Sequence, residues 1–370
     1  MASFIYYQDQ ARKRTGLLIA LFALSVLGIG LVIWLAAEFA VYYASGAADA
    51  GTAWQPNWSI LRYTLIGEFL IIGLASMSKI SSLSSGGAAV AESMGAREIT
   101  GEPSSLEEQQ LLNVVEEMSI AARIPAPRVF VMDGEPSINA FAAGTHTGDA
   151  AVAVTAGALM VFNREELQAV IGHEFSHIVN GDMSMNMKII SVLAGVMMLS
   201  FFGSMIMRIG ADSLMMQRPR QSSKGKDNGQ TVAFVIMIVG AAAWLAGIAG
   251  LFFGQLIQAA VSRQREFLAD ASSVQFTRNP MAMASALKKI GGVSRNRIRS
   301  SHRDEYAHLF FTSGAASLFS SHPPLEERIR RFDPGFNGEF PDTDEALAAA
   351  FIDSQKEYGD EDGDWEEEEE

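Results

Sequence analysis

Two histidines and a glutamate lie close together near the middle of the chain, in the segment His173-Glu174-Phe175-Ser176-His177. The surrounding stretch has the periodicity of an amphipathic helix, and residues four apart share one face of a helix. Both imidazoles can therefore reach one metal ion, while Glu174 lies about 100° around the helix from His173. Two neutral imidazoles beside a carboxylate are suited to zinc-assisted hydrolysis.

The composition limits which other ligands such a metal can have. The 370-residue chain contains no cysteine and six histidines, which excludes disulfides and thiolate sites. Its net charge of −14 is largely local, because residues 357–370 include ten acidic side chains. Such a run repels itself and buries no apolar surface, so we expect a disordered tail. Its lack of basic side chains interleaved with aromatic ones argues against nucleic-acid binding.

A second acidic pair follows the last apolar segment of the chain. Glu266 and Asp270 are four residues apart and would share one helical face. Glu266 would supply a third metal ligand and leave one position for water, and Asp270 would accept a hydrogen bond from a ligand imidazole. A surface helix with scattered charges is the alternative that this segment alone leaves open.

Four apolar segments, at about 17–37, 63–78, 189–207 and 231–261, predict membrane-spanning helices. Basic residues before the first and after the second place both ends of this hairpin in the cytoplasm. The basic loop between the third and fourth conflicts with that orientation, so these two either cross the bilayer or line a cavity. Glu68, within the second segment, is expected to face a protein interior.

The segment between the two apolar hairpins has the pattern of a small α+β domain. It predicts a helix over 103–118, strands over 128–132, 138–143 and 151–155, and a helix that begins at Asn163 with Glu166 in a capping box. We expect a helix-dominated α+β fold with a small sheet beside the metal helix. The expected domains are a membrane hairpin (1–80), two parts of the domain that holds the metal helix and the third ligand (81–188 and 262–340), an apolar hairpin between them (189–261) and the tail (341–370).

Several motifs resemble those of the HtpX type of membrane zinc metalloprotease, a family that includes the CAAX prenyl proteases. They occur in the expected order at 91–96, 138–144, 167–182, 262–270 and 321–328. The resemblance covers most of the chain, and the order of apolar segments around the metal helix also matches. The acidic tail departs from the family pattern but lies outside every motif.

The resemblance implies a membrane-anchored, gluzincin-like zincin with one Zn²⁺ per chain. His173, His177 and Glu266 would be the zinc ligands, Glu174 the general base, and His322 a group that stabilises the oxyanion or gates the site. An extended substrate would lie along an edge strand formed by Asn139, Ala140, Phe141 and Ala142, with Ala143 at its end.

Other side chains keep two interpretations. His322 precedes two prolines and would otherwise only start a helix. Asp182 either supports the metal helix or caps its end near Gly181. His146 is expected in a loop, and His302 and His308 at the surface.

The sequence therefore predicts a membrane-bound zinc metalloendopeptidase, and the resemblance implies that it removes damaged or misassembled membrane proteins. We expect it in the inner (cytoplasmic) membrane, with the protease domain facing the cytoplasm and with peptides and lipid as partners. CAAX-type processing, a catalytically silent zinc-binding scaffold and a transporter are the alternatives, the last disfavoured by the sparse charge within the apolar segments. The natural substrate and the oligomeric state stay open.

Overall fold

The computed structural model describes residues 2–47, 50–83, 86–216, 228–293, 322–345 and 347–348. The chain divides into a helical unit, Lys13–Leu83 with Asn186–Ala260, and a sheet unit formed by the remaining segments. Each unit is described separately. Several features of the sequence lie outside the described residues: His302, His308, the loop cations Arg218, Arg220, Lys224 and Lys226, Ser321, and the acidic run at 357–370.

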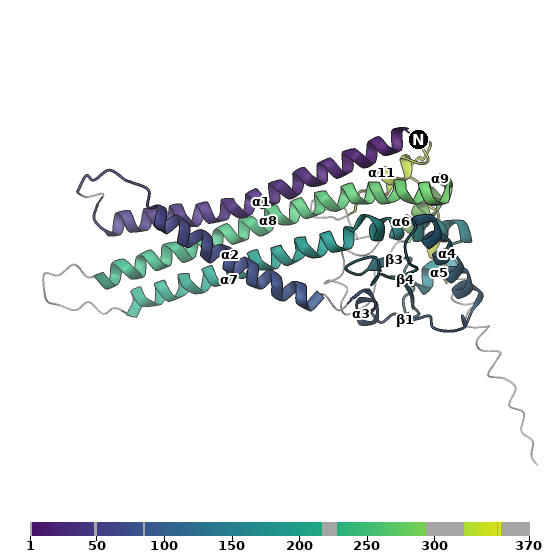
Figure 1. Ribbon diagram of the computed structural model, residues 1–370, viewed down its shortest axis with the longest axis horizontal. Helices are drawn as coiled ribbons and strands as arrows, with labels where there is room; N and C mark the ends of the chain where they lie inside the picture. The colour runs from purple at the N-terminus through teal and green to yellow at the C-terminus, as the bar shows by residue number, and fades with distance from the viewer. Residues whose placement is uncertain are drawn as a thin grey trace, which may run out of the picture. The chain divides into compact units, whose positions relative to one another are not determined.

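Four long helices carry the apolar segments (Figure 1): α1 (Ala2–Ala44), α2 (Trp58–Leu83), α7 (Asp182–Met216) and α8 (Asn228–Thr277). By length and composition each is sufficient to cross a membrane, which confirms the four predicted segments. Within the helical unit, a Cβ on Gly203 would collide with the α8 backbone at Trp244, so α7 and α8 approach closely there. Glu68 is buried next to Gly30 of α1, as expected for an acid that faces protein.

The sheet unit is built on four short strands in the order β1-β2-β4-β3. They are β1 (Arg97–Glu98), β2 (Arg128–Met132), β4 (Ala151–Thr155) and β3 (Ala140–Ala143). Strands β2 and β4 are parallel, and the other two pairs are antiparallel. Strand β3 is therefore an edge strand, with one row of its backbone groups directed away from the sheet.

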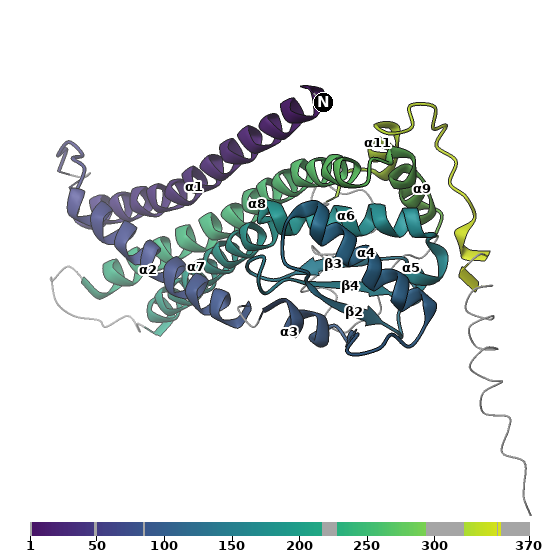
Figure 2. The same ribbon diagram turned by 45° about the vertical axis from the view of Figure 1, so that its right-hand side comes forward.

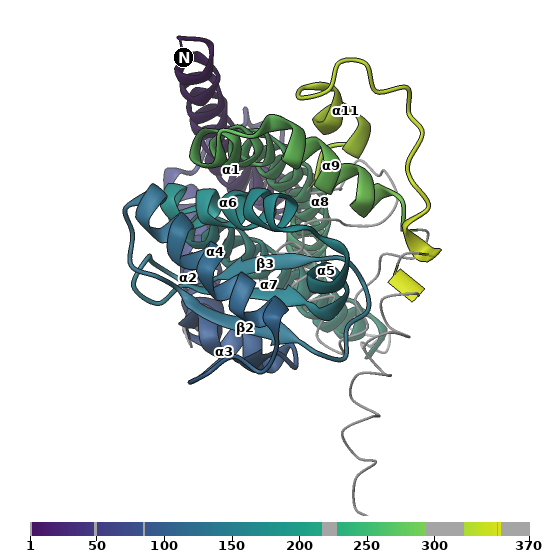
Figure 3. The same cartoon turned by 90° about the vertical axis from the view of Figure 1, so that its right-hand side faces the viewer.

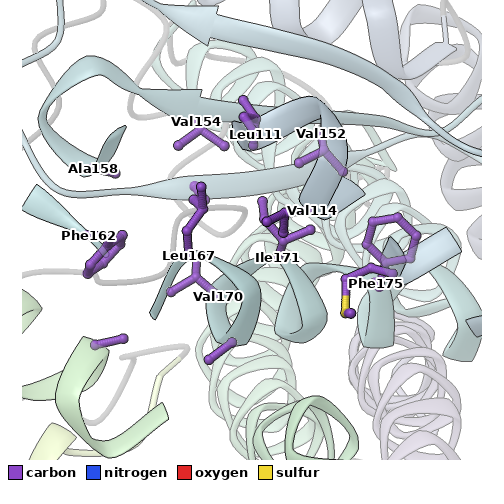
Figure 4. Close-up of a cluster of buried hydrophobic side chains, with 14 of the residues drawn as sticks. Leu111, Val114, Val152, Val154, Ala158, Phe162, Leu167, Val170, Ile171 and Phe175 are labelled. Carbon is purple, nitrogen blue, oxygen red and sulfur yellow. The ribbon is translucent and has the colours of Figure 1, made fainter. Parts of the chain in front are cut away.

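Helices cover both faces of this sheet. On one face, the core joins the sheet to α4 (Leu106–Ala122) and α6 (Arg164–Asn180), and α9 (Pro280–Gly291) packs beyond α6 (Figures 2 and 3). On the other face, α3 (Gly86–Ser93) packs against Phe130 and Phe141. Figure 4 shows Val152 and Val154 of β4 among the side chains of Leu167 and Ile171 of α6. This apolar contact fixes α6 on the sheet, and α6 carries the histidine pair.

The ends of α6 are defined by its own sequence. The Asn163 side chain accepts from Glu166 N at 2.9 Å, and the Glu166 carboxylate accepts from Asn163 N at 2.9 Å, which is the predicted capping box. Glu166 also accepts from Ser285 Oγ and Lys289 Nζ of α9, both at 2.6 Å. At the other end Gly181 takes the left-handed conformation (φ 68°) that glycine adopts without strain.

Two predicted elements differ from the structure at their ends. The strand predicted over 138–143 begins at Ala140, because Asn139 N donates to the Thr155 side chain (2.9 Å) and not to a backbone carbonyl. The helix predicted over 103–118 covers Leu106–Ala122, with Ser105 as its N-cap and Arg123 in the left-handed region (φ 58°) after its end. The strands predicted over 128–132 and 151–155 are confirmed.

Candidate metal centre

His173 and His177 lie one turn apart on α6 and point toward the same spot. Their Nε2 atoms are 3.1 Å apart, and both rings are largely withdrawn from solvent. Two imidazole nitrogens at this separation repel each other through their lone pairs unless a proton or a cation lies between them. The helical spacing seen in the sequence therefore produces a shared binding point.

Glu266 of α8 brings a carboxylate to that point. Its Oε2 lies 3.5 Å from His173 Nε2, and its Oε1 lies 3.5 Å from His177 Nε2. One donor atom from each of the three residues lies within 4.8 Å of the other two. The structure thus joins residues that are far apart in the sequence into one cluster of two nitrogens and a carboxylate.

The outer nitrogen of each imidazole meets its own aspartate. His173 Nδ1 is 2.9 Å from Asp270 Oδ1, and His177 Nδ1 is 2.9 Å from Asp182 Oδ2. A carboxylate at Nδ1 favours the tautomer with its proton on that nitrogen, which leaves the Nε2 lone pair for a metal. Asp270 thus contacts the first ring, and Asp182 makes a similar contact on the second.

The charges of the cluster favour a cation. Burial opposes protonation of His177, but its contacts with Asp182 and Glu266 outweigh burial and hold its pKa well above the ordinary value. The pKa of His173 is also raised, against burial, by Asp270 and Glu266. Burial raises the pKa of Glu266, yet His322, His173 and His177 together hold it well below its usual range. The cluster therefore stabilises a cation beside the two Nε2 atoms.

This donor set fits zinc. Structural and catalytic zinc ions bind imidazole nitrogen and carboxylate oxygen, and a catalytic ion keeps one position for water beyond three protein ligands. His173, His177 and Glu266 supply two nitrogens and one carboxylate, and their outer atoms are held by further polar groups. Together these residues have the composition of a catalytic zinc site.

Arg328 of α11 (Leu325–Arg330) also belongs to the cluster, although no role was predicted for it. Its side chain is fully buried, and its Nε and Nη2 donate to the two carboxylate oxygens of Asp270 at 2.8 and 2.7 Å. Its Nη1 also lies 3.3 Å from Glu266 Oε2. The guanidinium outweighs burial and lowers the pKa of Asp270 below its ordinary value. Its position in the same motif as His322 was the signal in the sequence.

His322 lies beside a candidate ligand. Its Nδ1 is 2.9 Å from Glu266 Oε2, and its side chain is nearly buried. The structure therefore places His322 at the cluster. The contact is with the Glu266 carboxylate. His322 can therefore act on this candidate ligand, in addition to the two roles that the resemblance suggests, oxyanion stabilisation and gating.

Glu174 lies between the histidine pair and the edge strand. Its carboxyl is buried, and burial raises its pKa, whereas the histidines and a hydrogen bond from the Ala142 N–H act in the opposite direction. A raised pKa suits a residue that must take and return a proton near neutral pH. The small side chains of Ala140 and Ala142 pack in the core with α6, which allows this close approach.

The register of β3 identifies its outward-facing groups. Thr155 N donates to Asn139 O at 3.0 Å, so the backbone groups of Asn139, and then of Phe141 and Ala143, face β4. Those of Ala140 and Ala142 face away from the sheet, and the Ala140 N–H is held by the Asn139 side chain at 3.0 Å. The candidate substrate strand is thus an edge strand, and its Ala142 lies beside Glu174.

His146 lies apart from this cluster. It follows β3 in a loop in which Asp149 accepts from His146 N, and its ring is exposed. Its Nδ1 accepts from Gly148 N at 3.1 Å. These contacts agree with the loop position expected for it.

Comparisons with known proteins identify the family of this chain. The model of Peptidase family M48 matches residues 105–334, a range that includes both histidines, Glu266 and Arg328. A "Protease HtpX homolog" of Streptococcus thermophilus is 41% identical over 244 residues, covering 64% of this chain and 76% of the relative. One of Streptococcus pneumoniae is 38% identical over 243 residues, with the same coverage.

The solved structure of S. mikatae Ste24p is a more distant match. It is 18% identical with a TM-score of 0.43, and the match covers 72% of this chain and 58% of that one. That likeness is too low to bear on the fold. The family match and the HtpX homologues are sufficient by themselves: this chain, with four helices that can span a membrane, belongs to peptidase family M48.

Proposed function

We propose that this protein is a membrane-bound zinc metalloendopeptidase. The observation that carries the proposal is the meeting of His173, His177 and Glu266 at one point, with the buried carboxyl of Glu174 beside them. The three residues would hold one zinc ion per chain. When bound, zinc supplies Lewis acidity, which activates the attacking water and polarises the scissile carbonyl.

Glu174 is the general base in this mechanism. Its carboxylate takes a proton from the attacking water and then delivers it to the leaving amine. The hydrogen bond from the Ala142 N–H orients the carboxylate, and burial brings its pKa upward toward the working range. A site with a purely structural metal has no need of this group, which favours an active enzyme over a silent scaffold.

The substrate is proposed to be an extended segment of a polypeptide. Within the segment Asn139 to Ala142, the outward backbone groups of Ala140 and Ala142 would bind it through main-chain hydrogen bonds, which recognise backbone and not side-chain identity. His322 would stabilise the oxyanion or hold Glu266 in place. A sequence-tolerant site attached to membrane helices fits the removal of misfolded membrane proteins, whereas CAAX-type processing would require recognition of a prenyl group.

We propose that the sheet unit lies in the cytoplasm of a cell with an inner membrane. The basic residues Arg12, Lys13 and Arg14 lie at the start of the first candidate span, Lys13–Ala44, and Lys79 lies near the end of the second, Trp58–Ser81. Positive residues at both ends of this hairpin favour the cytoplasmic side. Protease digestion of right-side-out and inverted vesicles tests the orientation, because only inverted vesicles would expose the sheet unit.

The proposed activity is tested with the full chain purified in detergent and an unfolded, casein-like substrate. We expect cleavage that stops after zinc is removed with a chelator and returns when zinc is added back. A prenylated CAAX peptide in parallel separates the two enzymatic hypotheses, because general cleavage predicts no preference for it. Cleavage that persists in the metal-free protein would contradict the proposal.

A further inference from the structure

We infer that Asp182 and Arg265 form a positioning relay that holds His177 for the metal and ties this ligand to the base of the apolar hairpin. The inference rests on the proposed zinc site but assigns two residues outside its ligand set and its general base. Asp182 is the first residue of α7, and Arg265 lies in α8, directly before Glu266. Both belong to the sheet unit.

The Asp182 carboxylate is used by two partners. It is buried, its Oδ2 lies 2.9 Å from His177 Nδ1, and its Oδ1 lies 2.9 Å from Arg265 Nη1. Both oxygens are thus directed at side chains from other helices. The end of α6 has its own cap, because Gly181 N donates to the carbonyl of Ile178. Capping of α6 therefore does not account for the position of the Asp182 side chain.

Arg265 completes the relay from the other arm of the hairpin. Its Nη1 meets Asp182, and its Nη2 lies 3.7 Å from Met185 Sδ, almost one turn further along α7. The guanidinium is largely buried, so its charge is screened less by water than that of a surface arginine. With one oxygen at the guanidinium, the Asp182 carboxylate is held in the orientation in which its other oxygen faces His177 Nδ1.

The other imidazole has a similar arrangement. His173 Nδ1 meets Asp270, and Arg328 holds both oxygens of Asp270. Each histidine of the pair thus contacts an aspartate that contacts an arginine. The two relays differ in origin: Arg328 belongs to α11, whereas Asp182 and Arg265 stand at the two ends of the segment 183–264 that carries the third and fourth apolar stretches.

This difference has a physical consequence. The pair Asp182–Arg265 joins the start of α7 to α8 next to two candidate ligands, His177 and Glu266. Separation of the two helices at this point would remove the charge partner of Asp182 and loosen the ring of His177. Orienting partners of this kind contribute about 10-fold to 100-fold to metal affinity. The base of the hairpin is therefore part of what sets the affinity of the site.

The test measures zinc affinity of the full-length protein in detergent, by competition with a chromogenic chelator. We expect Asp182→Ala and Arg265→Gln each to weaken zinc binding by about 10-fold to 100-fold. The double variant should be no weaker than the poorer single variant, because both changes break one relay. Arg265→Lys should recover part of the affinity, since it restores the positive charge.

Two controls separate positioning from a general loss of structure. Asp333→Asn removes a comparable ion pair, with Lys288 at 2.7 Å, in the same unit but away from the metal site, and should leave zinc affinity unchanged. Asp182→Asn has the size of the native residue and keeps a neutral acceptor, so it should fold and still alter the visible spectrum of the cobalt-loaded protein. A merely structural role would leave that spectrum unchanged.

The outcomes are distinct. Zinc affinities and cobalt spectra of the Asp182 and Arg265 variants equal to those of the wild type would overturn the relay and leave the proposed protease intact. Additive losses in the double variant would overturn the linkage between the two residues. A wild-type protein that binds no zinc would overturn the proposed function and, with it, this inference.

Discussion

The backbone N–H of Ala142 donates a hydrogen bond to the carboxyl of Glu174, which joins the edge strand to the candidate general base. Glu174 is on the metal helix, and Ala142 is on the outward side of β3, so a substrate added to this edge would pass beside the base. In the proposed mechanism this contact would link peptide binding to proton transfer.

Ala142→Pro tests that link. Proline removes the outward N–H without removing a hydrogen bond to β4, and edge strands tolerate proline in this position. We expect zinc content to be unchanged, while kcat for an unfolded substrate falls because Glu174 loses its orienting donor. Ala143→Pro is the contrasting variant, because its N–H faces β4 and its loss should lower the melting temperature. Full activity in Ala142→Pro would disprove the link.

Loss of a ligand should abolish the effect of zinc on stability. A metal that binds only the folded state raises its stability by about 2.7 kcal/mol at 100 times Kd. We expect added zinc to raise the melting temperature of the wild type but not that of His177→Ala or Glu266→Ala. His146→Ala, which changes an exposed histidine in a loop, should respond like the wild type. A zinc response in Glu266→Ala would remove Glu266 from the ligand set.

Arg328 should be essential for the stability of the metal-free protein. Replacement by methionine leaves the carboxylates of Asp270 and Glu266 buried without their guanidinium, a change that costs about 3–5 kcal/mol. Arg330→Met is the control, because its ion pair with Glu326 is exposed and contributes about 0–1 kcal/mol. Thermal unfolding of the two variants measures the difference, and equal melting temperatures would contradict the role given to Arg328.

The ion pair between Glu108 and Arg97 should give the sheet unit an acid-sensitive contribution. Burial raises the pKa of Glu108, but the Arg97 guanidinium, at 2.6 Å, and the Ser104 N–H lower it below the ordinary value of 4.5. A carboxyl with a lowered pKa in the folded state stabilises fully above the unfolded value, and this contribution disappears as the pH falls through the folded value.

Glu108→Gln should therefore be less stable than the wild type at neutral pH, by about 1 kcal/mol. The difference in melting temperature should shrink as the pH falls below 4.5. Glu107→Gln, which changes the exposed neighbouring residue, should follow the wild type throughout. A difference that stays constant down to about pH 3 would contradict the assignment of the effect to this carboxyl.

The parts of the fold that the sequence predicted depend on local patterns. The histidine spacing placed His173 and His177 on one helical face, and the capping box at Asn163 fixed where that helix begins. Four apolar segments were recognised by their length, because a bilayer demands a minimum span. The start of β3 was misplaced by two residues because Asn139 bonds to a side chain, which no alternation of residues reveals.

The contacts around the metal ligands were not available from the sequence in the same way. Arg328 meets Asp270 across 58 residues, and Arg265 meets Asp182 from the other arm of the apolar hairpin. Such pairs depend on how helices pack, and charged residues are common in helices without a buried partner. For Asp182 the sequence left two roles open, and the distance to His177 Nδ1 favours the supporting one.

The central claim is that Glu174 performs the chemistry at a zinc ion that other residues hold. Zinc content and cleavage of an unfolded, casein-like protein should be measured together for the wild type and for Glu174→Gln, both purified in detergent. We predict about one zinc per chain in each protein and a rate lower by about 10²-fold to 10⁴-fold in the variant. Cleavage by Glu174→Gln at the wild-type rate would contradict the account.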